Sequence, residues 1–259
     1  MKPTPIVRNL LIANILIFLL QELGNVPFIQ LFKLHYIASP DFQPWQLLTY
    51  MFLHAGIHHL FSNMLSLFFF GPWIENTLGS RRFIPFYFIC GMGAALINFA
   101  IIFAESEVRN SYLTKLEKNP TEENFVAYLN AYHHKDYVEK ADKMQEQIDK
   151  MSPEEKQEQA KELKKIFQEQ LNYYSLVGAS GAVFGILMAF MLLFPNVELM
   201  LFFFPVPIKA KYLIGLYIIY ELFMGTQYSN VSNVAHFAHL GGALMALILI
   251  KIWKIKRIH

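Results

Sequence analysis

Long stretches without charge alternate with short polar breaks along the chain, and this pattern predicts membrane-spanning helices. Uncharged runs cover residues 45–74, 83–104, 171–197 and 222–250. Each is longer than the roughly 20 residues that cross a bilayer, and the first is long enough to include interfacial chain as well. With an apolar stretch near the N-terminus, the pattern predicts six spans, at about residues 6–26, 48–74, 83–104, 174–194, 209–226 and 236–254.

Apart from Lys33, the basic residues of the short connecting segments fall on one side of the predicted membrane. They are Lys2, Arg8, Arg81, Arg82, Lys209, Lys211, Lys251, Lys254, Lys256 and Arg257. The positive-inside rule makes that side cytoplasmic, so we expect a multi-pass protein with both termini in the cytoplasm. No organellar transit segment precedes the first predicted span, which favours a bacterial cytoplasmic (inner) membrane.

Residues 105–170 have a different composition, because 15 of the 20 acidic residues of the chain lie there. The span count places this segment outside the membrane, as an insertion between spans 3 and 4. The sequences NPTE and SPEE predict helices capped by Asn119 and Ser152. Apolar residues follow a helical stripe: Phe125, Tyr128, Leu129, Tyr132, Ala141, Met144 and Ile148. We expect a helical hairpin, with a solvated charged spacer as the alternative.

Composition agrees with a membrane protein. Charged residues make up 16% of the chain and hydrophobic residues 54%, whereas soluble domains carry about 25% charged residues. Cys90 is the only cysteine, which argues against a disulfide, a thiolate metal cluster and a cysteine–histidine enzyme. We expect an all-α polytopic membrane protein with spans 1–3 in residues 1–104, the insertion in 105–170 and spans 4–6 in 171–259. No cofactor and no nucleic-acid partner are expected.

Three clusters of polar residues interrupt the predicted spans, although polar side chains are costly in lipid and usually functional there. They are FLHAGIHHLFSNM in span 2, GASG in span 4 and NVAHFAHLGGALMAL in span 6. Spans 2, 4 and 6 all begin outside, so the three clusters are predicted to lie at a similar depth below the outer surface.

Small residues beside Ser180 and His239 predict close contact between spans 4 and 6. At helical spacing they form two small-xxx-small ridges, one in each span: Gly181 and Gly185, then Gly242 and Ala246. Such ridges let helices approach closely in a bilayer. The contact would bring the Ser180 hydroxyl to the His239 imidazole. A serine hydroxyl becomes a useful nucleophile only when such a base takes its proton.

An oxyanion formed at Ser180 would also need hydrogen-bond donors. The candidates are the backbone N–H groups near Gly178 and Ser180 and the side chains of His59 and Asn63, which lie one helical turn apart. Glu221 falls toward the outer end of span 5, and we expect no carboxylate to orient the imidazole. The predicted catalytic unit is a Ser–His pair.

Simpler interpretations of the same residues exist. Ser180 could be a small residue that only permits helix packing, and His236 is a rival base. The pattern His-x2-Gly-x3-small fits His239 and not His236. His54 and His58 are four residues apart, a spacing that could bind zinc, but we expect structural hydrogen bonding there and no metal site.

The motifs GASG, HAGIHHLFSN and AHLGGALMAL resemble those of the rhomboid intramembrane serine proteases, as do PWQLLTYMFLH, ENTLGSRRF and FFFPVPIKAKY. The resemblance covers about residues 1–104 and 171–259. It implies a six-span bundle with a water-filled active site open to the outside, and a Ser180–His239 dyad. It also implies an oxyanion hole formed by His59, Asn63 and the Ser180 backbone.

The resemblance further implies substrates that are single-span membrane proteins, cut near the outer membrane boundary. Span 5 and residues 226–235 would form the entry gate. Two positions depart from the family pattern. Gln46 follows Trp45 where arginine is common, and Phe184 stands where a tyrosine commonly stacks on the catalytic imidazole. The alternatives to a serine endopeptidase are a rhomboid-like pseudoprotease that binds or escorts membrane clients, and a small transporter.

Overall fold

The structure is a computed structural model that describes residues 2–23, 28–132, 148, 150–201, 204–228 and 235–258. It forms two compact units. The bundle unit comprises residues 1–35, 41–99 and 175–259, and the insertion unit comprises residues 36–40 and 100–174. The predicted gate residues 229–234 lie outside the described part of the chain.

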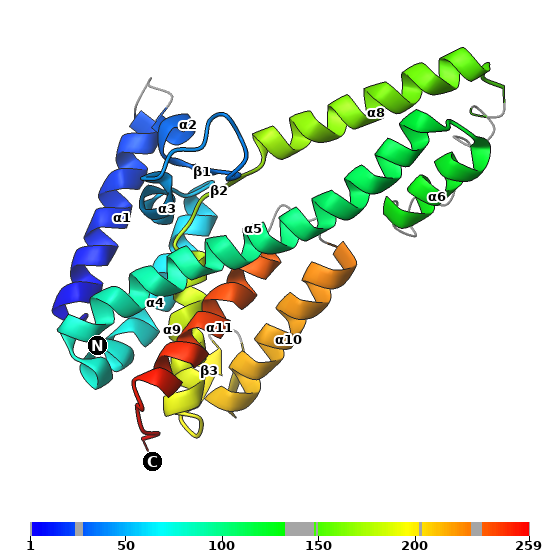
Figure 1. Ribbon diagram of the computed structural model, residues 1–259. Helices are drawn as coiled ribbons and strands as arrows, with labels where there is room; N and C mark the ends of the chain where they lie inside the picture. The colour runs from blue at the N-terminus through cyan, green and yellow to red at the C-terminus, as the bar shows by residue number, and fades with distance from the viewer. Residues whose placement is uncertain are drawn as a thin grey trace. The chain divides into compact units, whose positions relative to one another are not determined.

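Helices dominate both units (Figure 1). They are α1 (Pro5–Leu23), α2 (Phe28–Phe32), α3 (Gln46–Thr49), a 3-10 turn (Tyr50–Phe52), α4 (Ile57–Leu78), α5 (Ser80–Lys118), α6 (Glu122–Tyr132), α8 (Pro153–Tyr173), α9 (Ser180–Leu193), α10 (Ala210–Tyr228) and α11 (His236–Ile252). The expected all-α architecture is supplemented by two short antiparallel strand pairs. These are β1 (Leu34–His35) with β2 (Ser175–Leu176), and β3 (Glu198–Leu201) with β4 (Phe204–Lys209).

Helix α9 is the central helix of the bundle unit. Ten of its 14 residues are buried, because its sequence is apolar on every face and a helix of that kind needs neighbours all round. It packs against α4, α10 and α11 (Figure 1). The residue that begins this central helix is Ser180.

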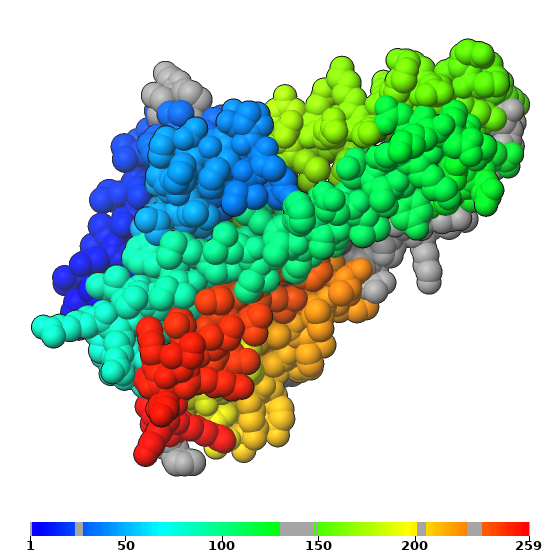
Figure 2. Space-filling model, viewed as in Figure 1, coloured from blue at the N-terminus to red at the C-terminus, as the bar shows by residue number. Residues whose placement is uncertain are grey.

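Glycines allow the helices of the bundle unit to pack backbone to backbone. A Cβ added to Gly242 of α11 would lie 1.9 Å from the carbonyl oxygen of Gly181 of α9. On the same face of α9, one turn further on, a Cβ on Gly185 would lie 2.6 Å from the Cβ of Cys90 in α5 and 3.3 Å from the carbonyl oxygen of Gly242. Helix α11 also meets the bundle-unit part of α5, residues 80–99, through Gly241, and these two segments lie side by side in Figure 2. The predicted ridge residues Gly181 and Gly242 are therefore in direct contact.

Outward faces of the bundle unit are apolar. On α1, buried residues recur every three or four positions, and the remaining faces expose isoleucine and leucine. Apolar exposure on this scale is typical of a surface that is covered by lipid or by another protein. By length and composition, two of the described helices could cross a membrane alone, α1 and α5. Helices α9 and α11 are apolar but shorter, so the count of six spans stays a prediction.

Gln46 organises the connection between α1 and α4. Its side-chain oxygen accepts hydrogen bonds from the N–H groups of Gln43 and His35, at 3.0 and 3.3 Å. Its side-chain nitrogen donates to the carbonyls of Asp41 and Leu31, at 3.1 and 3.4 Å. The side chain is buried. The loop is thus anchored by the amide of Gln46, at the position where the rhomboid pattern commonly has arginine.

The insertion unit has its own apolar core, which excludes the alternative of a solvated spacer for its described residues. The core residues are Leu113, Leu116, Phe125, Tyr128, Leu129, Ile148, Ala160 and Phe167. Four of them belong to the predicted stripe, whereas Ala141 and Met144 of that stripe lie outside the described residues. At its surface, Lys164 donates to Glu117 at 2.6 Å, and this hydrogen bond holds the pKa of Glu117 below its ordinary value.

In the insertion unit, one of the two predicted helix caps is correct and the other helix begins at a different residue. Ser152 caps α8 in a capping box with Glu155, as predicted. The prediction of Asn119 as a cap is wrong. Thr121 takes that place, because its carbonyl accepts from Phe125 N–H and its hydroxyl from Asn124 N–H. The helix therefore begins two residues later than the sequence motif indicates.

Candidate active site

Ser180 occupies the first turn of α9. The N–H groups of a first helical turn have no partner within the helix, and the helix dipole adds positive charge there. The backbone N–H of Ser180 therefore lies at an end suited to bind an anion. The residue is half-buried, as a nucleophile approached by substrate must be.

His239 is held on three sides. It lies on α11 one turn before Gly242, the residue in backbone contact with α9. Its ring stacks on Phe184 of α9, with centroids 4.2 Å apart and planes 7° apart. Phe184 thus supplies the aromatic face that the rhomboid resemblance gives to a tyrosine. Its Nδ1 lies 2.9 Å from Oε2 of Glu221 on α10.

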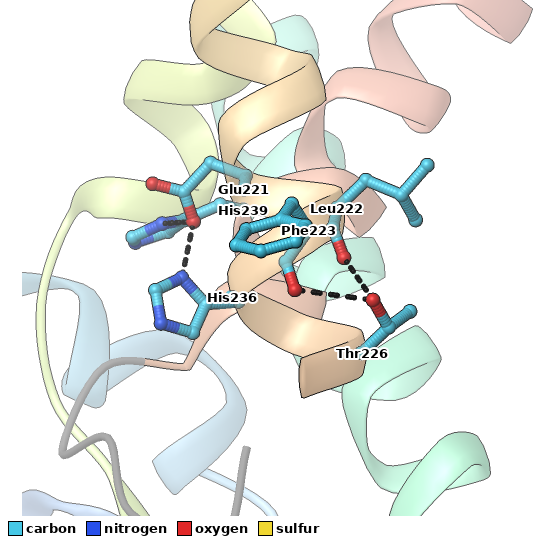
Figure 3. A network of polar contacts seen from close by, with 6 residues as sticks. All are labelled: Glu221, Leu222, Phe223, Thr226, His236 and His239. Carbon is cyan, nitrogen blue, oxygen red and sulfur yellow. Dashed lines mark hydrogen bonds and ion pairs between the residues drawn. The ribbon is translucent and has the colours of Figure 1, made fainter. Parts of the chain in front are cut away.

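Glu221 corrects the expectation that no carboxylate orients the imidazole. The same Oε2 atom also lies 2.7 Å from Nδ1 of His236, so one carboxylate oxygen joins both histidines (Figure 3). The side chains of Glu221, His236 and His239 are only 3%, 5% and 10% exposed. The signal in the sequence was an acidic residue within a predicted span, which is rarely accidental.

Contact with Glu221 determines which nitrogen of His239 can act as a base. An ionised carboxylate only accepts hydrogen bonds, so the facing Nδ1 carries the proton and Nε2 keeps a free lone pair. No hydrogen bond joins Ser180 to His239 within the described residues. Catalytic hydrogen bonds are often open in proteins without substrate and tighten when substrate binds.

His59 and Asn63 provide the side-chain donors of the candidate oxyanion site. A Cβ on Gly178 would lie 2.8 Å from Nε2 of His59, so this ring packs directly on the segment that leads into Ser180. Nδ1 of His59 accepts from the N–H of Ala55 at 3.4 Å, which leaves Nε2 as the protonated nitrogen. Nδ2 of Asn63 is buried and has no hydrogen-bond partner among the described residues.

Gly178 has a different role from the oxyanion donor that the sequence analysis predicts. Its N–H donates to the carbonyl of Tyr50 at 2.9 Å, so it is not free to bind an oxyanion. Its φ of +121° is a conformation that only glycine adopts readily, and it leaves room for His59. Gly178 shapes the site and does not donate to it.

Metal binding at this site was not expected, yet three groups here could hold an ion. Ligand atoms of Glu221, His236 and His239 all lie within 4.8 Å of one another. The nitrogen–oxygen distances of 2.7 and 2.9 Å are those of direct hydrogen bonds, so the three groups satisfy one another. The suggested zinc pair does not form a comparable set, because His54 is buried and His58 is exposed.

His236, the rival base, bonds to the same carboxylate as His239 but packs against a different helix. It is the first residue of α11, where its Cβ faces Gly225 of α10. His239 instead stacks on Phe184, in the helix that carries Ser180. The geometry therefore favours His239 as the base and His236 as a second partner of Glu221.

Comparison with known proteins identifies the family of the chain. The family model for the Rhomboid domain matches residues 41–110 and 161–254. RHOMBOID-like protein 2 of Arabidopsis thaliana is 45% identical over 58 residues, which are 22% of this chain and 18% of that protein. The putative rhomboid protease YdcA of Bacillus subtilis (strain 168) is 46% identical over 43 residues, 17% of this chain and 22% of that protein.

A similar match joins the chain to a relative described as inactive. The inactive RHOMBOID-like protein 8 of Arabidopsis thaliana is 39% identical over 62 residues, 24% of this chain and 17% of that protein. The chain thus spans about a fifth of the length of the curated relatives it matches. The family model itself matches well over half of the chain. The protein is therefore a membrane-embedded member of the rhomboid family.

Proposed function

We propose that the protein is an intramembrane serine endopeptidase that cleaves single-span membrane proteins near the outer membrane boundary. The observation that carries the proposal is the backbone contact between Gly181 and Gly242. It joins the helix that begins with Ser180 to the helix that carries His239, while the imidazole stacks on Phe184 of the serine's own helix.

Chemistry would proceed by acyl transfer. Ser180 Oγ attacks the scissile carbonyl carbon while Nε2 of His239 takes the hydroxyl proton. The oxyanion receives hydrogen bonds from the Ser180 N–H, from Nε2 of His59 and from the unpartnered amide of Asn63. His239 then gives its proton to the leaving amine, and a water molecule repeats the cycle on the acyl-enzyme.

Helix length supports access of water to this site. The 14 residues of α9 rise about 21 Å, which is less than the roughly 30 Å of a hydrocarbon core. Ser180 would then begin its helix below the membrane surface, with irregular chain before it. Irregular backbone at that depth is tolerated only inside protein or beside a water-filled cavity, and hydrolysis needs such a cavity.

The membrane arrangement belongs to the same proposal. We assign six spans with both termini in the cytoplasm, the insertion outside, and residence in a bacterial cytoplasmic membrane. Helix α10 would be the entry gate, since much of its surface is exposed and apolar. A pseudoprotease is the second candidate, because one similar protein is an inactive member. The presence of both Ser180 and His239 favours an active protease over a pseudoprotease.

The deciding experiment is labelling of purified protein by a fluorophosphonate, paired with cleavage of a model single-span substrate. Wild type and the control Ser66→Ala should label and cleave, whereas Ser180→Ala and His239→Ala should do neither. Ser66 is a half-buried residue of α4 whose hydroxyl donates to the carbonyl of Ser62. Cleavage that survives Ser180→Ala, or a folded wild type that neither labels nor cleaves, would overturn the proposal.

A further inference from the structure

Glu221 links the candidate gate helix to the candidate base. It lies on α10, and its Oε2 accepts from Nδ1 of His239 and from Nδ1 of His236, both on α11 (Figure 3). All three side chains are at least nine-tenths buried. A carboxylate buried at such a place is costly unless its hydrogen bonds are met, and here one oxygen receives two.

The carboxylate acts on His239 in three ways. It holds the proton on Nδ1, so that Nε2 is the nitrogen free to take the proton of Ser180. It fixes the rotation of the ring together with the stacked Phe184. It also places negative charge beside the imidazolium that forms when the serine attacks. The same three effects define the acidic member of a Ser-His-Asp triad.

His236 serves the carboxylate and not the serine. By donating to Oε2 at 2.7 Å it provides a second fixed contact for Glu221, in addition to that from His239. The close approach of Gly225 to His236 brings α10 against the start of α11 at this level. Two donors from adjacent turns of one helix therefore hold one acceptor of another.

The outward face of α10 is exposed. Leu216, Ile219 and Leu222 are 66%, 62% and 52% exposed, while Ile214 and Glu221 are buried toward the bundle. Any displacement of α10 away from α11 would remove the carboxylate from Nδ1 of His239. The contact of α10 with α11 and the alignment of the His239 imidazole therefore depend on each other.

We propose that Glu221 is a positioning residue that completes a Ser180–His239–Glu221 triad, and that α10 must be seated against α11 for the base to be aligned. The proposal rests on the protease function proposed above. In the reaction, the proton moves from Ser180 Oγ to Nε2 of His239 and then to the leaving amine. Glu221 stays ionised throughout.

The test compares full-length Glu221→Gln and Glu221→Asp with wild type in proteoliposomes. In Glu221→Gln, the amide favours the wrong tautomer, so kcat should fall about 10²–10⁴-fold with KM little changed. Glu221→Asp keeps the charge and should recover at least about tenfold of the loss. Wild-type kcat in Glu221→Gln would overturn the proposal.

A fluorophosphonate separates base alignment from a role in gating alone. This small probe reacts with the serine and does not need the lateral entry of a transmembrane helix. Triad positioning predicts that the rate of Ser180 labelling falls in Glu221→Gln in parallel with kcat. If Glu221 only held α10 in place, Glu221→Gln would change KM and leave the rate of Ser180 labelling unaltered. That result would count against the triad. Leu16→Ala, at a leucine that is 55% exposed on α1 and outside the site and the gate, is the control and should stay within about twofold of wild type.

A spectroscopic measurement tests the contact without activity. In protein with ¹⁵N-labelled histidine and His236→Gln, the Nδ1–H proton of His239 should resonate far downfield because it is bound to a carboxylate. Glu221→Gln in the same background should remove that resonance. Its persistence would refute the triad even if the wild type cleaves substrate. Its loss alongside an inactive wild type would instead refute the protease function and leave the positioning intact.

Discussion

The bundle unit contains helix contacts made through glycine, whereas the core of the insertion unit is filled by apolar side chains. In the bundle unit, Gly181 meets Gly242 and Gly185 meets Cys90, so backbones come nearly into contact. In the insertion unit, large side chains such as Phe125, Tyr128 and Phe167 fill the core. Water drives apolar side chains together, whereas helices in lipid gain stability from close packing and hydrogen bonds between helices. The difference indicates which solvent each unit is built for.

The two units also differ in their charged contacts. In the insertion unit, the Lys164–Glu117 pair is partly exposed at the surface. In the bundle unit the carboxylate of Glu221 is buried and joins two helices. Ionisable groups within a membrane span are costly and usually functional, so the buried carboxylate of Glu221 points to chemistry.

The largest effect is expected from Gly242→Ala. The new Cβ would lie 1.9 Å from the Gly181 carbonyl oxygen, so α9 and α11 must separate. Overpacking costs typically about 1–3 kcal/mol and more where backbone must move, and we expect cleavage to be abolished. Thermal unfolding and fluorophosphonate labelling measure the two effects. Leu244→Ala, exposed on the same helix, should leave labelling unchanged. Full activity of Gly242→Ala would show that the close contact is dispensable.

Phe125→Ala tests the other kind of packing. Phe125 is 1% exposed in the core of the insertion unit, and its truncation should destabilise that unit by about 3–5 kcal/mol. Hydrogen exchange of the α8 amides should accelerate accordingly. Ser180 labelling should stay within about twofold of wild type, since none of the site residues belongs to this unit. A parallel loss of labelling would break the comparison by showing that the two units are coupled.

Gly178→Ala should affect catalysis more than stability. The added methyl group would meet the His59 ring at 2.6–2.8 Å, and the residue has a φ of +121°. Displacement of one oxyanion donor costs about 10²–10³-fold in kcat, which steady-state cleavage would detect. Gly56→Ala is the matched control, because its backbone is extended and nothing lies within 4 Å of the added Cβ. Equal kcat in the two variants would exclude His59 as a donor.

The smallest effect is expected from Ser152→Ala, which removes the capping box of α8. Loss of such a cap costs about 1 kcal/mol, so limited proteolysis should cut the insertion unit several-fold faster. Ser111→Ala is the comparison, since Ser111 is an exposed residue inside α5 and caps no helix. Equal protease resistance in both variants would mean that the cap does not limit local stability.

Local patterns in the sequence predict the features that depend on spacing along one helix. Gly181 and Gly242 were identified from small-residue spacing, and Ser152 from its capping motif. The part of Glu221 could not be derived in this way, because it depends on the rotation of α10 about its axis. The hydrogen bond from Gly178 to Tyr50 likewise joins distant segments. Asn119 and Thr121 are both good caps, and only the path of the chain selects between them.

Gln46 has a consequence for chimeric proteins made within the family. A primary amide both donates and accepts, and this one uses both capacities on backbone groups drawn from four positions between Leu31 and Gln43. Arginine or lysine could satisfy only the carbonyls, and glutamate only the N–H groups. Swapping this loop with that of a relative should therefore succeed only when residues 31–46 are transplanted as one block.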